Sequence, residues 1–64
     1  MEKLIKDYEL LYDRIVERIE TLQTLLNTEA LRNRERDRLT ARIDALEEER
    51  FDLVQTIYEM RKHL

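Results

Sequence analysis

Two apolar seams, each built on alternating steps of four and three residues, constrain this chain more than any other feature. The first half fills all eight seam positions with apolar residues: Met1, Ile5, Tyr8, Tyr12, Ile15, Ile19, Leu22 and Leu26. The second half repeats the spacing: Leu39, Ile43, Leu46, Arg50, Leu53, Ile57, Met60 and Leu64. Arg50 is its one polar member. Because this spacing keeps apolar side chains on one face of an α-helix, the sequence predicts two amphipathic helices.

The polar stretch between the seams, NTEALRNRERDR at 27–38, is where we expect the chain to turn. If it folds back there, the seams pair antiparallel with residue numbers that sum to 65, as in Leu26 with Leu39. The mirror point inside the polar stretch favours an all-α fold, an antiparallel two-helix hairpin that resembles a short coiled coil. We expect a single domain over 1–64, made of a helix at about 2–29, a turn at about 30–34 and a helix at about 35–63.

This register leads to three local expectations. Glu29 lies opposite Arg36, and the two are expected to form an ion pair at the closed end. Asn33 is expected to cap the second helix. The two arginines that interrupt apolar stripes are expected to place their guanidinium groups on acidic residues at the seam edge, or to form a polar layer that fixes register: Arg18 on Glu47, and Arg50 on Asp13 or Glu17.

One straight helix is the alternative architecture. It would be about 96 Å long at about 1.5 Å per residue. The chain has no Gly and no Pro to force a break, and an apolar register beginning at Leu4 passes through the polar stretch without a phase slip. However, Glu29, Arg32 and Arg36 would then fill three successive seam positions and leave the middle without apolar contacts. The hairpin is therefore favoured.

Apolar residues also flank each seam and widen its apolar arc to about 160–180°. A single neighbouring helix covers less than this, and a chain of 64 residues without cysteine has only a small core and no disulfide to support it. We therefore expect a homodimer that forms a four-helix bundle, with another protein as the alternative partner. The candidate interface residues are those of the two flanks: Leu4, Leu11, Leu25, Phe51, Val54 and Tyr58.

The composition argues against catalysis. Without Cys, Ser or Gly, the chain has no cysteine or serine nucleophile, no Cys/His zinc site and no glycine-rich phosphate loop. Glu59 and His63 are spaced for a shared metal, but two ligands are few, and His63 has a sufficient role as a cation at a helix C-terminus. We expect no enzyme activity, cofactor or metal. With no apolar run of about 20 residues and no secretory signal, we expect no membrane association and a cytoplasmic location.

Arg34, Arg38 and Arg42 form a stripe with helical spacing that can contact phosphates. Glu35 and Asp37 lower the local potential, and no aromatic residue is interleaved to stack on bases. In size and shape, a dimeric hairpin resembles the Rop-like RNA-binding proteins, although the sequences share no motif. The expected function is therefore a non-catalytic, self-associating protein–protein interaction or adaptor module, with a nucleic-acid-binding regulator as the alternative.

Overall fold

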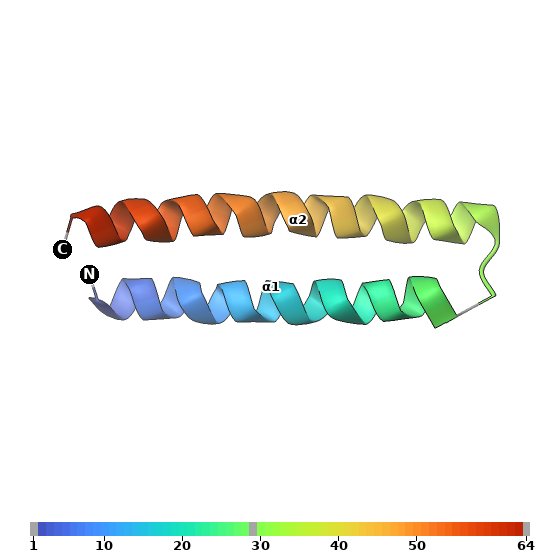
Figure 1. Ribbon diagram of the computed structural model, residues 1–64, viewed down its shortest axis with the longest axis horizontal. Coiled ribbons are helices and arrows are strands. Elements are labelled where there is room, and N and C mark those ends of the chain that lie inside the picture. The colour runs from blue at the N-terminus through green and yellow to red at the C-terminus, as the bar shows by residue number, and fades with distance from the viewer. Residues whose placement is uncertain (1, 29, 64) are drawn as a thin grey trace.

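In the computed structural model, the chain forms two helices that lie side by side and run in opposite directions (Figure 1). Helix α1 spans Glu2–Thr28 and helix α2 spans Asn33–Lys62. The structure describes residues 2–28 and 30–63, and residues 30–32 belong to neither helix. The Cα atoms extend over 48 × 14 × 11 Å. This length matches a hairpin and is half that of the straight helix, so the predicted antiparallel hairpin is confirmed.

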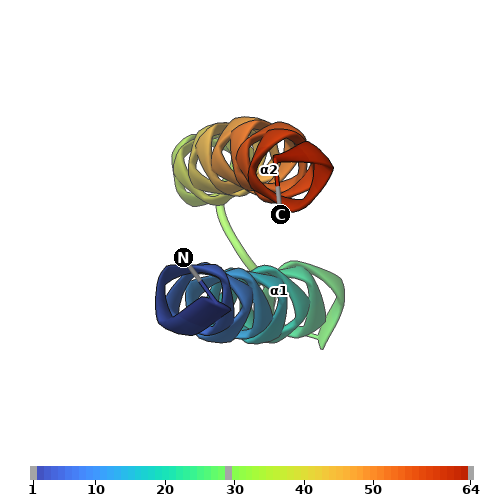
Figure 2. The same ribbon diagram turned by 90° about the vertical axis from the view of Figure 1, so that its left-hand side faces the viewer.

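The core follows the two seams. Its central cluster combines three buried residues of α1 with Ile43 of α2, and half-buried leucines pack against it: Ile15, Ile19 and Leu22, then Leu26, Leu39, Leu46 and Leu53. Ile5 is buried nearer the open end. Every described seam position is buried or half-buried, which confirms the seams; Met1 and Leu64 lie outside the described residues. The end-on view shows a single layer of two helices, so each helix has one neighbour only (Figure 2).

The closed end differs in detail from the expectation. Helix α2 begins at Asn33, about two residues early, and its N-cap is Arg32, with φ −73° and ψ 157°. The Arg32 carbonyl already accepts a hydrogen bond from the Arg36 N–H at 3.0 Å, which places Asn33 inside the first turn. The prediction that Asn33 caps the helix is therefore wrong. Glu29 lies outside the described residues, and with it the expected ion pair to Arg36.

We expect Arg32→Ser to raise the free energy of unfolding by about 1 kcal/mol. Arg32 makes no side-chain capping hydrogen bond, whereas a serine hydroxyl can accept one from a free N–H group of the first turn. Urea unfolding followed by circular dichroism measures the change. Arg34→Ser is the matched control, because the same substitution inside the helix gains no cap and loses helix propensity. Equal effects from the two variants would contradict the assignment of the N-cap.

Candidate interaction surfaces

The two apolar flanks lie on opposite faces of the flat hairpin. Val54 and Tyr58 line an open groove together with Glu9 of α1, on what we call the front face. At about 100° per residue, Leu4 and Leu11 lie about 140° and 160° around α1 from Glu9, and so turn to the back face. We call Leu4, Leu11 and Leu25 the leucine stripe, and Phe51, Val54 and Tyr58 the aromatic flank.

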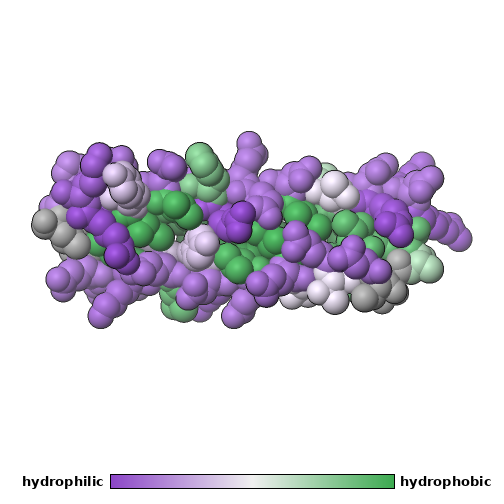
Figure 3. Space-filling view, in the orientation of Figure 1, coloured by the Kyte–Doolittle hydropathy of each residue, from purple (hydrophilic) through white to green (hydrophobic). Residues whose placement is uncertain are grey.

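Both flanks are exposed, as their position outside the seams predicts. Leu11 and Leu25 are 43% and 40% exposed, and Phe51 is 63% exposed. In the space-filling view, apolar side chains follow the line between the two helices and polar side chains surround them (Figure 3). Leu10, which the sequence interpretation did not assign to a flank, is also exposed. It lies next to the leucine stripe, on the outer side of α1, and the only signal for it was its position beside Leu11.

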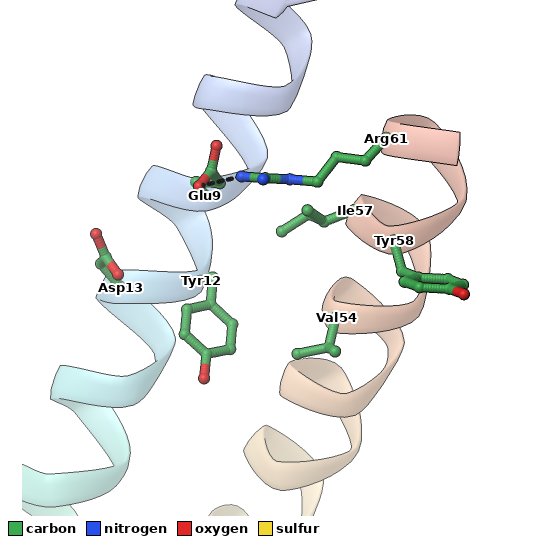
Figure 4. Close-up of a pocket in the computed structure, with 7 residues that line it drawn as sticks. All are labelled: Glu9, Tyr12, Asp13, Val54, Ile57, Tyr58 and Arg61. Carbon is green, nitrogen blue, oxygen red and sulfur yellow. Dashed lines mark hydrogen bonds and ion pairs between the residues drawn. The ribbon is translucent and has the colours of Figure 1, made fainter. Parts of the chain in front are cut away.

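The front groove has a volume of about 430 Å³. Side chains from both helices line it, and its floor and rim combine apolar and charged groups (Figure 4): Glu9, Tyr12, Asp13, Val54, Ile57, Tyr58 and Arg61. The Arg61 guanidinium crosses the groove to donate a hydrogen bond to the Glu9 carboxylate at 2.9 Å. Both side chains are exposed, so this ion pair is expected to contribute well under about 1 kcal/mol. The groove is therefore open to solvent and has charged groups at its edge.

The sequence interpretation missed two contacts of α2 near this groove. The pairing of Arg61 with Glu9 depends on the reach of a long side chain between helices. The Lys62 Nζ atom lies 5.2 Å from the centre of the Tyr58 ring. This cation–π contact joins residues four apart on one helix, a spacing that the sequence does contain.

Arg50 reaches a carboxylate at the seam edge, but a different one from those expected. Its guanidinium pairs with Glu47, one turn earlier on the same helix, and not with Asp13 or Glu17. A partner three residues away on the same helix is always within reach, whereas a partner on the other helix depends on the spacing of the pair. The expected Arg18–Glu47 contact is also wrong, because no ion pair joins these two residues in the structure. Arg18 is exposed and makes no ion pair among the described residues.

The arginine stripe lies in the first three turns of α2, beside the closed end. Arg34, Arg38 and Arg42 are all exposed, and none of them joins an ion pair with any residue that the structure describes. At about 100° per residue, positions four apart are rotated by about 40°, so the stripe winds around the helix. The three guanidinium groups are available to solvent without sharing one flat surface.

Metal binding and membrane crossing are two further properties on which the geometry bears. Within residues 2–28 and 30–63, no group of three or more His, Cys, Asp or Glu side chains is placed to hold a metal ion. Over the same residues, neither helix has a stretch that is long and apolar enough to cross a membrane. No protein-family model, curated protein or solved structure matches the chain. What the structure defines is the class: an antiparallel two-helix hairpin with an exposed apolar flank on each face.

Proposed function

We propose that this hairpin is a non-catalytic interaction module that self-associates into a dimeric four-helix bundle. The supporting observation is its surface: the accessible area is 5370 Å². A compact monomer of the same 7.9 kDa mass is expected to expose about 4,400 Å². The chain thus exposes about 1,000 Å² more than a compact domain of its size, and its exposed side chains include the large apolar residues of both flanks.

The excess has a clear physical origin. Stable domains bury the apolar side of one layer against a second layer, and this hairpin is a single layer. A second hairpin supplies the missing layer. An interface of standard size removes about 800 Å² from each subunit, most of the excess. Self-association is therefore the simplest way for so thin a fold to reach ordinary burial.

The opposite placement of the flanks supports the adaptor part of the proposal. One interface between two flat hairpins covers one face of each, so either the leucine stripe or the aromatic flank stays exposed in the dimer. The remaining face is then available to a different protein. A module of this kind joins copies of itself on one side and holds a partner on the other, and no bond needs to be made or broken.

Light scattering at micromolar concentrations is expected to give twice the 7.9 kDa chain mass. The midpoint of thermal unfolding is expected to rise with protein concentration, because a partner that binds only the folded chain stabilises it by mass action. A monomer mass with a concentration-independent midpoint would overturn the proposal.

Nucleic-acid binding is the second candidate, supported by the exposed guanidinium groups of Arg34, Arg38 and Arg42. Steeply salt-dependent binding of RNA or DNA, abolished by Arg34→Glu with Arg38→Glu, would replace the adaptor function with this one.

A further inference from the structure

We propose that the second copy packs antiparallel on the leucine stripe, with Arg18 at the twofold axis. This inference rests on the proposed self-association and adds the face, the orientation and the register. Arg18 falls on the line of the leucine stripe, seven residues after Leu11 and seven before Leu25. On a helix, seven residues correspond to about 10.5 Å. The two exposed leucines are thus spaced symmetrically about one exposed arginine.

This symmetry matches what a twofold contact requires. When two copies of α1 cross antiparallel at Arg18, Leu11 of each copy lies opposite Leu25 of the other. Four leucine side chains that are 40–43% exposed in the hairpin then gain apolar partners. Leu4 falls opposite position 32, the exposed Arg32 in the connection of the second copy, and so lies outside this pairing of leucines. One rotation therefore gives both Leu11 and Leu25 an apolar counterpart.

The position of Arg18 along the hairpin favours the same face. It lies close to the midpoint between the start of α1 and the connection at 30–32. A twofold axis there overlaps the two hairpins over nearly their full 48 Å length. The aromatic flank is centred about 10 Å nearer the open end, so an antiparallel contact there leaves about 20 Å of each hairpin uncovered. It also brings the groove carboxylates of Glu9 and Asp13 close to their own copies.

The charges select the antiparallel orientation. Residues 23–42, at the closed end, hold five arginines and three acidic residues, for a net charge of +2. The middle of the hairpin, residues 13–22 and 43–52, holds three arginines and eight acidic residues, for a net charge of −5. A parallel dimer places the two cationic ends side by side, at a cost in Coulomb energy. The antiparallel dimer separates them by the length of the hairpin.

The same axis also pairs charges along α2. Within one hairpin, residues whose numbers sum to 65 lie at the same level, so Glu47 of α2 lies level with Arg18 of α1. Arg42 and Asp52 lie five residues before and after Glu47. Both turn away from the front groove at about 100° per residue. The twofold rotation therefore sets Arg42 of one copy opposite Asp52 of the other, twice in each dimer. In a parallel dimer, these charged residues face the leucine stripe instead.

Arg18 fixes the register. If the two copies slide by one heptad, Arg18 of one copy lies on Leu11 or Leu25 of the other, and a guanidinium displaces an apolar contact. Of these registers, only the one centred on Arg18 keeps Leu11 and Leu25 opposite each other and both arginines in one layer. The exposed carboxylate of Glu49 lies near that layer and is available to pair with them. A polar residue with this effect on helix pairing is a known determinant of register.

Cysteine crosslinking tests the inference directly, because the chain contains no cysteine. Under mild oxidation, Arg18→Cys is expected to give a disulfide-linked dimer with itself, since the two positions meet at the axis. Leu11→Cys and Leu25→Cys are each expected to stay unlinked alone, with their copies about 21 Å apart across the axis, and to crosslink when mixed. Val54→Cys, on the front face, is the matched control and is expected to stay unlinked. Circular dichroism confirms that each variant folds.

Each other outcome has a distinct meaning. Crosslinking of Val54→Cys without Arg18→Cys places the second copy on the front face and overturns the inference, while the proposed self-association stands. Crosslinking of Leu11→Cys alone overturns the register. If no variant crosslinks and the wild-type chain has the monomer mass, the proposed function itself fails.

Discussion

Ile43→Ala is expected to lower the free energy of unfolding by about 3 kcal/mol. Ile43 is 8% exposed and is the one α2 residue in the buried cluster with Ile15, Ile19 and Leu22. The truncation leaves a cavity where the two helices meet. A single domain of this size holds only about 3–5 kcal/mol in total, so most of the helical signal is expected to be lost at low protein concentration. Urea unfolding followed by circular dichroism gives the value.

Phe51→Ala is the matched control. It deletes more atoms than Ile43→Ala, yet Phe51 is 63% exposed, and we expect a loss of under about 1 kcal/mol. The comparison separates burial from side-chain size. Equal losses for the two variants would show that Phe51 is covered in solution. That result would place the interface on the aromatic flank and contradict the assignment of the leucine stripe.

The second large effect is expected on the molecular mass in solution, when charged residues replace leucines of the leucine stripe. Leu11→Glu and Leu25→Lys are each expected to reduce the dimer to the 7.9 kDa chain mass, because each variant leaves two charged side chains facing leucines across the axis. Both positions are exposed in the hairpin, so the direct cost to the isolated fold is small. Light scattering at micromolar concentrations measures the mass, and circular dichroism reports any loss of helix that follows from loss of the partner.

Mixing the two variants is expected to restore the dimer. In the mixed pair, one side of the axis combines Glu at position 11 with Lys at position 25, and the other side retains Leu25 against Leu11. Rescue by mixing therefore depends on the antiparallel register centred on Arg18. The mixture still tests this register if one variant is unfolded on its own. Dimers of Leu11→Glu alone, or a mixture that stays monomeric while both variants are folded, would contradict that register.

The helices, their antiparallel pairing and the core could be predicted from the sequence. Apolar residues at alternating steps of four and three leave few ways to bury both seams, and the buried residues Ile15, Ile19, Leu22 and Ile43 all occupy seam positions. The polar stretch at 27–38 also indicates the place of the turn, to within about two residues. These features depend on periodicity, which is a property of the sequence itself.

The contacts of the long charged side chains could not be predicted. Arg50 had acidic residues within reach on both helices, and the choice of Glu47 depends on rotamers and helix spacing. The Arg61–Glu9 pair depends in the same way on the width of the groove. The N-cap of α2 shows a related limit. Asn33 has the better side chain for capping a helix, yet the backbone places the N-cap one residue earlier, at Arg32.

The sequence by itself determined that this chain is a pair of helices with more apolar surface than one neighbour can cover. It identified both flanks, but not how they lie relative to each other. Only the tertiary structure decided that the leucine stripe and the aromatic flank face in opposite directions. The reason is that core packing fixes the rotation of each helix about its own axis, and this rotation sets the direction in which every flanking residue points.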